Sequence, residues 1–229
     1  MPSEARRALL VFFALLGGTI VILFLRALLT PAAPVLAKQA DSAVHIYPRD
    51  QEMALALSAG TEALRGEAGV YVLTSSGFVS VRASRNGFTC IVNRDGPGNE
   101  KPTCYDAVGT KRILPVDIAV GKLLLEGTPV AKIEAQVLAG FRSGKYHVAD
   151  RPGVAYMLSD HNWDRDPNTG KTMVFPPHIM FYAPYLTDKD IGSKGDFAYG
   201  LPSIGYRGPM GFIIVPCGAY CGKRINGSM

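Results

Sequence analysis

The most apolar stretch of the chain lies close to its N-terminus. From Ala8 to Leu25, eighteen consecutive positions carry no ionisable side chain. A helix over these residues spans about 27 Å, and its extension to Leu29 gives about 33 Å, close to the roughly 30 Å thickness of a bilayer's hydrocarbon core. The pattern predicts that residues 1–29 form a transmembrane anchor or a signal segment.

Two interpretations of this segment stay open, and both export the residues that follow it. Arg6 and Arg7 precede the apolar run, which favours a cytoplasmic N-terminus. A small-residue cleavage site ends at Ala37, but the run is longer than the roughly 7 to 15 residues of a signal core. We expect a single-pass inner-membrane protein with its domain in the periplasm. The alternative is a cleaved signal and a periplasmic or secreted protein.

The remaining chain is predicted to form a linker and one domain. Pro31 and Pro34 end the apolar helix, so residues 30–47 are assigned to the linker. Residues 48–229 are enough for one domain with a sizeable core. Within it, a short amphipathic helix is predicted from Pro48 to Gly60.

Alternating apolar residues then indicate strands. Residues 70–73 and 78–81 flank a turn with glycine at residue 77, which is typical of a β-hairpin. Residues 88–92 form a third predicted strand, and residues 104–105 return beside it. The pattern therefore predicts a small antiparallel sheet of three or four strands.

Two helices are expected to cover that sheet. Residues 115–126 are largely apolar, and residues 128–144 begin with a Thr-Pro pair and continue with apolar residues at helical spacing. We expect these segments to form an αα-hairpin over the sheet. Residues 154–158, 173–175 and 212–215 are further strand candidates, so the predicted fold class is α+β.

Charge changes the picture little. The chain has 24 Lys and Arg and 19 Asp and Glu. Three arginines and one glutamate fall in residues 1–37, so the exported part has 21 basic and 18 acidic residues, with both signs interspersed. Such a surface gives little reason to bind nucleic acid. We expect the membrane, reached through residues 8–29, and envelope components as partners.

The cysteines agree with export. All four lie after the apolar run, at Cys90, Cys104, Cys217 and Cys221. An even set in an oxidising compartment favours disulfides. A Cys90–Cys104 bridge would close a loop of about 15 residues, and the last two cysteines could close a small ring. Free thiols or a four-cysteine zinc site are the alternatives, although the spacing of the first pair fits no compact zinc knuckle.

Four motifs carry a resemblance to a known family. They are Asn86-Gly-Phe-Thr-Cys90, Pro102-Thr-Cys-Tyr-Asp-Ala107, Arg151-Pro-Gly-Val-Ala-Tyr-Met-Leu158 and Phe175-Pro-Pro-His-Ile-Met-Phe-Tyr-Ala-Pro-Tyr-Leu186. From about residue 49 to residue 215 the chain resembles a family of uncharacterised exported bacterial proteins. That family has no assigned activity, so the resemblance implies a single domain and an envelope location but no catalytic residues.

The last of these motifs also holds the first candidate site. Two prolines stiffen the chain before His178, and Phe181, Tyr182 and Tyr185 follow. Rigid aromatic residues of this kind can line a groove for a protein, a peptide or a glycan. Ordinary core packing is the alternative. The first hypothesis is therefore a non-enzymatic binding or structural domain without a cofactor, whose ligand contacts these four side chains.

A polar run supplies the second candidate site. Asp160, His161 and Asp164 have the side chains of a loose metal site. The calcium-loop spacing that begins at Asp164 fails, because Thr169 and Phe175 occupy the glycine and glutamate positions. We therefore expect a turn here and no bound metal. The second hypothesis is an exported hydrolase that uses His178 and His161, with or without a metal.

Overall fold

The computed structural model describes residues 44–166, 168–195, 197 and 200–217. The predicted anchor of residues 1–29, most of the linker and Cys221 lie outside the described residues. Within the described ranges, no helix is both long enough and apolar enough to cross a membrane. The described residues belong to one compact unit.

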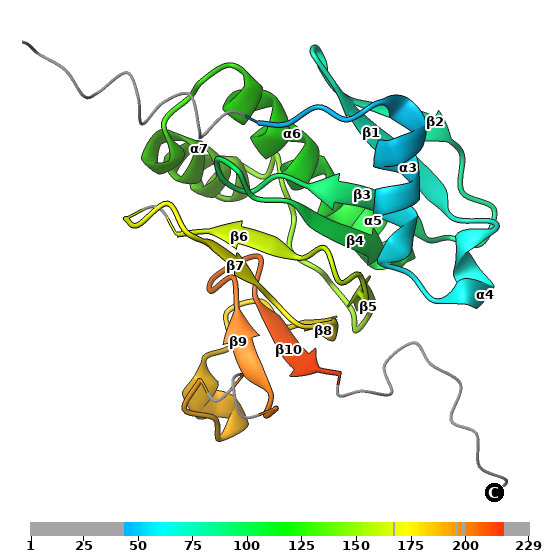
Figure 1. Cartoon of the computed structure of the whole chain (residues 1–229). Coiled ribbons are helices and arrows are strands. Elements are labelled where there is room, and N and C mark those ends of the chain that lie inside the picture. The colour runs from blue at the N-terminus through cyan, green and yellow to red at the C-terminus, as the bar shows by residue number, and fades with distance from the viewer. Residues whose placement is uncertain (1–43, 167, 196, 198–199, 218–229) are drawn as a thin grey trace, which may run out of the picture. The chain divides into compact units, whose positions relative to one another are not determined.

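The fold is α+β and is built on one mixed sheet (Figure 1). In chain order its eight strands are β1 Gly69–Thr74, β2 Gly77–Arg82, β3 Thr89–Asn93, β4 Lys101–Tyr105, β5 Val154–Met157, β8 His178–Tyr182, β9 Ser203–Gly205 and β10 Phe212–Pro216. Across the sheet the order is β2-β1-β3-β4-β5-β8-β10-β9. A separate antiparallel ribbon joins β6 (Trp163–Arg165) to β7 (Thr172–Val174).

This sheet is larger than the three or four antiparallel strands that the sequence predicts. The strands after residue 150 join it because β5 pairs with β4, and β8 then pairs with β5. One neighbouring pair, β1 and β3, is parallel. The parallel pair arises because β2 lies on the outer side of β1, so the chain must cross back before β3 begins on the inner side.

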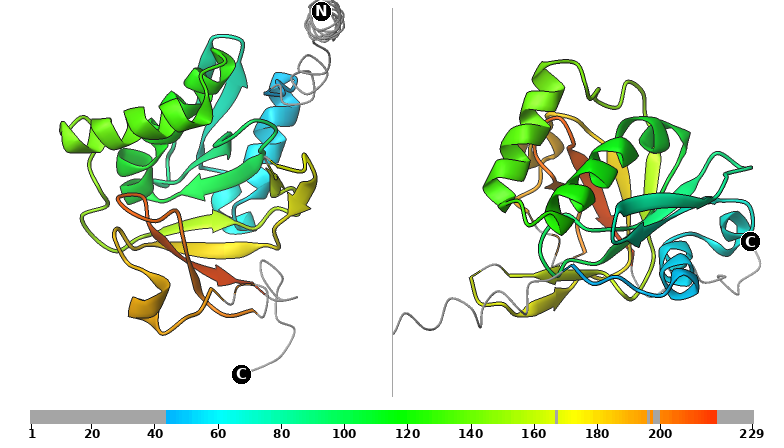
Figure 2. Two further views of the ribbon diagram at one scale, coloured as in Figure 1. Left: turned by 90° about the vertical axis from the view of Figure 1, so that its left-hand side faces the viewer. Right: turned by 90° about the horizontal axis from the view of Figure 1, so that it is seen from above.

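Helices cover both faces of the sheet. The helices are α3 (Arg49–Ser58), α4 (Glu62–Arg65), α5 (Ala107–Arg112), α6 (Leu114–Leu125) and α7 (Val130–Arg142), and a 3₁₀ helix, η2, spans Asp188–Ile191. α3 contacts β1, β3 and β4, whereas α6 contacts β2, β3 and α7. Seen from above in Figure 2, α3 and the α6–α7 pair lie on opposite sides of the strands.

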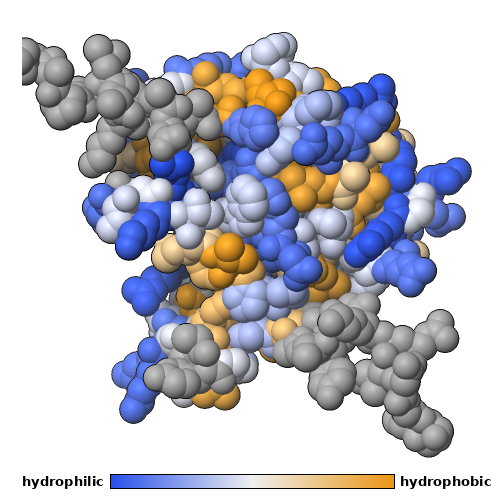
Figure 3. Space-filling model, in the orientation of Figure 1, coloured by the Kyte–Doolittle hydropathy of each residue, from blue (hydrophilic) through white to orange (hydrophobic). Residues whose placement is uncertain are grey.

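Strand alternation divides the core into two layers. Cys90 and Val92 of β3 face α3 and belong to one buried cluster, whereas Ile91 faces the other way and packs near Leu114 of α6. Asn93 points to the same side as Ile91, because side chains two positions apart share a face. The side chain of Asn93 therefore lies on the face of the sheet that α5, α6 and α7 cover. On the face of the molecule shown in Figure 3, apolar patches are separated by hydrophilic residues.

The predicted Cys90–Cys104 disulfide is confirmed. The two cysteines face each other on β3 and β4, with Cα atoms 4.0 Å apart and an S–S bond of 2.02 Å. Cys217 is also disulfide-bonded. The central pair of strands is thus covalently joined beneath α3.

The end of the predicted linker is attached to the domain. The carbonyl of His45 accepts a hydrogen bond from Arg94 at 3.3 Å, and the Tyr47 hydroxyl donates to Glu100 at 2.7 Å. Arg94 is buried and pairs with Glu52 of α3 at 3.1 Å. These contacts fix the point at which the chain enters the domain.

Candidate ligand-binding site

Two cavities adjoin on the face of the sheet covered by α5, α6 and α7. The first, called here the helix-side cavity, has a volume of about 200 Å³ and lies between the sheet and the α6–α7 pair. The second, called here the C-terminal cavity, measures about 340 Å³ and is bordered by β8, β9 and β10. Both are lined by Lys101, Tyr206, Met157 and Met180. These four side chains form the junction between the cavities.

Lys101 occupies this junction and is surrounded by acceptors. It is the first residue of β4, and alternation places it on the same face as Thr103 and Tyr105. Its ammonium group lies 2.8 Å from a carboxylate oxygen of Asp95, 3.3 Å from one of Asp164 and 3.3 Å from the Tyr206 hydroxyl. The side chain of Lys101 is 11% exposed. A buried ammonium needs such partners, because an isolated one would be strongly destabilised.

Electrostatics keep the Lys101–Asp95 pair charged. Burial by itself lowers the pKa of Lys101, but Tyr206 and the two neighbouring aspartates more than offset it, so this pKa is raised. Burial also opposes ionisation of Asp95, yet Lys101 and the hydrogen bonds from Tyr206 and Asn99 hold its pKa below the usual value. The pair is therefore ionised at neutral pH.

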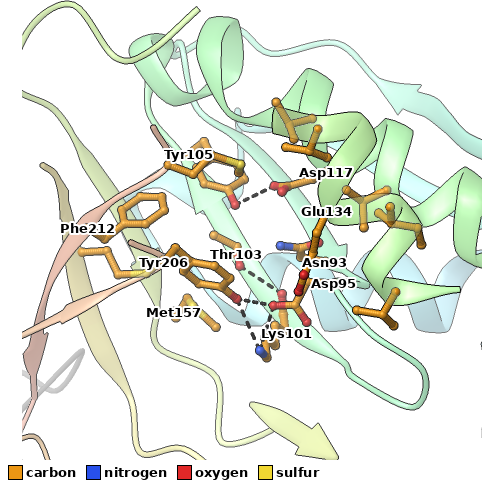
Figure 4. Close-up of a pocket in the computed structure, with 17 residues that line it drawn as sticks. Asn93, Asp95, Lys101, Thr103, Tyr105, Asp117, Glu134, Met157, Tyr206 and Phe212 are labelled. Atoms are coloured by element: carbon orange, nitrogen blue, oxygen red, sulfur yellow. Dashed lines mark hydrogen bonds and ion pairs between the residues drawn. The ribbon is translucent and has the colours of Figure 1, made fainter. Parts of the chain in front are cut away.

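Tyr206 reaches this cluster from a strained backbone conformation. Its φ is +48°, in the left-handed region, which costs a non-glycine residue about 1–2 kcal/mol. Its hydroxyl donates to Asp95, and its ring packs edge-on against Phe212 with centroids 6.0 Å apart. Residues in such conformations are held by their surroundings and are concentrated at functional sites. Figure 4 shows the Tyr206 hydroxyl pointing at Asp95 and Lys101.

A second polar group lies deeper in the helix-side cavity. Asp117 of α6 is 4% exposed and accepts a hydrogen bond of 2.7 Å from Tyr105. Burial raises the pKa of Asp117 to about 7, although hydrogen bonds from Tyr105 and Asn93 act in the opposite direction. Asn93 is itself buried, and its side-chain oxygen has no hydrogen-bond partner. The cavity thus contains an acid that titrates near neutrality and an unsatisfied acceptor.

Of the predicted ligand residues, His178 lines the C-terminal cavity. Its Nδ1 lies 2.8 Å from the Pro176 carbonyl oxygen. Because a carbonyl oxygen only accepts, Nδ1 carries the proton and Nε2 remains an acceptor. Burial, and to a smaller extent Lys101, lower the pKa of His178. The imidazole is therefore neutral at pH 7.

The four predicted residues do not line one groove. Tyr182 shares the inner face of β8 with His178, but its hydroxyl lies 2.8 Å from an Asp106 carboxylate oxygen and 3.0 Å from the Val154 carbonyl. Phe181 points to the opposite face of β8 and is 45% exposed. Tyr185 follows the end of the strand and is 65% exposed. Tyr182 thus has a structural role beside the N-terminus of α5.

The structure also separates the residues of the alternative metal site. His161 pairs with Glu100 and stacks on Trp163 with centroids 3.7 Å apart. Asp164 faces Lys101, and Asp160 is exposed. Within the described part of the chain, no group of three or more His, Cys, Asp or Glu residues is placed to hold a metal ion.

The hydrolase hypothesis lacks an arranged nucleophile at His178. Ser203 is the serine that lines the C-terminal cavity with it. β9, which carries Ser203, is separated from β8 by β10, so the two strands lie about 10 Å apart. No hydrogen bond joins the two side chains among the described residues, and a serine nucleophile needs its base within about 3 Å.

Sequence reasoning missed the residues that form the junction and the polar wall: Asp95, Lys101, Asp117, Tyr206 and Asn93. The sequence could have indicated Asp117, because it is an acidic residue inside α6, the most apolar helix of the domain. The sequence does not indicate Lys101 as a site residue, since a lysine at the start of a strand is usually exposed. Tyr206 comes from a segment 105 residues away from Lys101.

Comparison with known proteins does not assign this chain to a family. The resemblance of the four motifs to exported bacterial proteins stays a prediction. No protein-family model, curated protein or solved structure matches this chain.

Proposed function

We propose that this chain is a membrane-anchored or exported envelope protein whose domain binds a small, largely apolar ligand without catalysing a reaction. The binding site consists of the helix-side and C-terminal cavities, with Lys101 and Tyr206 at their junction. Residues 8–29 serve as the anchor in this proposal, and the domain lies on the far side of the membrane from the N-terminus.

The two adjoining cavities carry the proposal. Their walls are mainly methionine, valine, isoleucine and aromatic side chains, with a few polar groups at defined places. Small-molecule sites typically combine an apolar wall with a few orienting polar groups in this way. A ligand inside the cavities fits this geometry better than a protein, peptide or glycan surface, since Phe181 and Tyr185 line neither cavity.

The helices after β4 have a function in this proposal. Val130, Ile133 and Val137 of α7 recur at helical spacing and line the helix-side cavity. α6 contributes Val116 and Val120 from the neighbouring wall. In this proposal the two helices are the αα-hairpin that the sequence predicts, and they cover the ligand.

The disulfide supports the envelope location. Cys90 and Cys104 are bonded to each other, and disulfides persist in oxidising compartments rather than in the cytosol. A domain that follows residues 8–29 and reaches the periplasm would meet such conditions.

The test is a titration with an apolar fluorescent dye. N-phenyl-1-naphthylamine, which is uncharged at pH 7, is titrated into a chain that begins at Ser42, where the compact unit begins. We expect saturable fluorescence enhancement for the unchanged sequence. Val137→Phe fills the helix-side cavity and Ser203→Phe fills the C-terminal cavity, and each should weaken dye binding by about tenfold or more.

Leu138→Phe is the matched control. Leu138 is the next residue of α7 and is 45% exposed outside the cavity wall. This variant should bind the dye as the unchanged chain does. Equal affinity of Val137→Phe and Leu138→Phe, or no saturable binding by the unchanged chain, would show that the cavities are not the binding site.

A further inference from the structure

Four of the polar residues that line the helix-side cavity carry side-chain oxygen atoms that can accept hydrogen bonds. Asn93, Asp95, Asp117 and Glu134 all line this cavity, with Glu134 exposed on α7 at the rim. Figure 4 shows Asn93 between Asp117 and Asp95, with Glu134 beside them. A ligand in this cavity therefore meets both apolar side chains and these oxygen atoms.

The hydrogen-bond donors around this cavity are already engaged. Lys101 donates to Asp95 and Asp164, and the Tyr206 hydroxyl donates to Asp95 as well. The donors that remain are Thr103, which donates to the Lys101 carbonyl, and Tyr105 and the Asn93 amide, which both donate to Asp117. The cavity thus presents acceptors to a ligand.

One of these acceptors is left without a partner. The Asn93 side chain is 6% exposed, lines the cavity, and its Oδ1 accepts no hydrogen bond. Leaving a buried acceptor unsatisfied is unfavourable, and native structures usually fill it from the protein, water or a ligand. A donor group that enters the cavity would therefore gain this hydrogen bond together with those to Asp117 and Glu134.

We propose that the helix-side cavity binds a small primary amine, with its ammonium group at Asn93, Asp117 and Glu134 and its apolar body against α6 and α7. The inference rests on the proposed function, because it assigns a ligand class to the same site. An ammonium group has three donors and a positive charge, so it matches one neutral oxygen and two carboxylates.

The size of the cavity limits the ligand. A 150 Å³ apolar cavity holds a benzene ring, so about 200 Å³ leaves room for roughly eight non-hydrogen atoms. Benzylamine and benzyl alcohol both have that size and differ in the polar group alone. Benzoate has nearly the same size and carries the opposite charge.

The experiment uses the full chain in detergent micelles at pH 7.5, with ¹³C-labelled methionine methyl groups. Met157, Met180 and Met210 line the cavity, so their methyl resonances report binding directly. We expect benzylamine to bind about tenfold or more tightly than benzyl alcohol, and benzoate to bind most weakly. Asp117→Asn should weaken benzylamine binding about tenfold and leave benzyl alcohol binding within about threefold.

Two further variants separate ligand contact from general effects of charge or folding. Asn93→Leu removes the unpaired oxygen at similar side-chain size and should weaken benzylamine more than benzyl alcohol. Glu126→Gln removes one negative charge at the end of α6, where the carboxylate is half exposed and lies outside the cavity wall. This control should bind all three compounds as the unchanged chain does.

Each outcome decides the inference. Equal binding of benzylamine and benzyl alcohol would overturn the amine assignment while leaving a binding cavity in place. Preferred binding of benzoate would overturn it in favour of Lys101 as the ligand anchor. Failure of all three compounds, together with failure of the naphthylamine dye, would reject the proposed function itself.

Discussion

Lys101, which is largely buried, and Asp117, which is buried, are ionisable residues on the same face of the sheet, but their surroundings differ. Lys101 lies against two carboxylates, which stabilise its charged form. Asp117 accepts hydrogen bonds from neutral groups, and Asp95 is an additional negative charge near it. Burial therefore raises the pKa of Asp117, whereas the ion pair keeps Lys101 protonated. One cavity wall thus holds a fixed charge and a titrating one.

The raised pKa of Asp117 predicts a specific pH dependence of stability. The folded-state value of about 7 exceeds the ordinary value of 3.8. Between these two values the folded chain keeps a proton that the unfolded chain releases, so the free energy of unfolding falls as pH rises. At about 1.4 kcal/mol per pKa unit, the decrease reaches up to about 4 kcal/mol by pH 8.

Asp117→Asn removes this titration while an amide oxygen still accepts from Tyr105. We expect the variant to be more stable than the unchanged chain by a few kcal/mol at pH 8 and about equally stable near pH 4. Urea unfolding across this pH range measures the difference. Glu126→Gln is the control, and a pH-dependent difference of similar size in that variant would contradict the assignment to Asp117.

At the scale of helices and strands, local patterns predicted much of the fold. Glycine at residue 77, with φ of +113°, forms the turn between β1 and β2 that the sequence indicates. Pro48 precedes α3 as expected. The pairing of β4 with β5 was not predictable in this way, since nearly fifty residues and three helices separate the two strands. Periodicity identifies a strand, but strand order depends on contacts distant in sequence.

The approach of α6 to the sheet depends on one small residue. Gly121 lies against Phe78 of β2, and a Cβ atom at residue 121 would come 2.4 Å from the Phe78 ring. Ala at this position gains about 1 kcal/mol of helix propensity, but overpacking a tight contact costs about 1–3 kcal/mol. α6 would have to shift, and the wall of the helix-side cavity would shift with it.

We therefore expect Gly121→Ala to lower the free energy of unfolding by up to about 2 kcal/mol in a denaturant titration. Gly66→Ala is the matched control, because φ at Gly66 is −61° and no atom lies within 4 Å of the added methyl group. That variant should be neutral or more stable by up to about 1 kcal/mol. Equal effects of the two substitutions would mean that α6 does not depend on the close contact with Phe78.

At the scale of the whole molecule, the candidate site is a product of topology. Asn93 and Lys101 come from neighbouring strands, Asp117 from a helix, and Tyr206 from the last part of the described chain. No short motif contains these residues together, so local spacing in the sequence could not predict that they lie at one site. His178 was predicted as a site residue from its rigid proline-rich surroundings, and it lines the C-terminal cavity alone.

The Cys90–Cys104 disulfide bears on two properties of the protein: its location in the cell and the stability of its sheet. The bond joins two adjacent strands of the sheet and closes a loop that contains the Asp95 turn. If residues 8–29 direct export, this bond forms in the periplasm. If the domain stays in the cytosol, both sulfurs are kept reduced. The oxidation state of these two cysteines in cells therefore tests the topology of the whole chain.

In cells that express the full chain, we expect Cys90 and Cys104 to resist alkylation until a reductant is added, and the chain to remain with membranes after alkaline extraction.

A Cys90→Ala, Cys104→Ala double variant should lose about 3 kcal/mol of unfolding free energy, because a loop of about 15 residues is no longer closed in the unfolded state. Protease added to spheroplasts should digest the domain. If both sulfurs are reduced and the domain is protected from protease, the domain lies in the cytosol and the export prediction is wrong. If the sulfurs are oxidised but the chain is not retained with membranes, the result favours a cleaved signal.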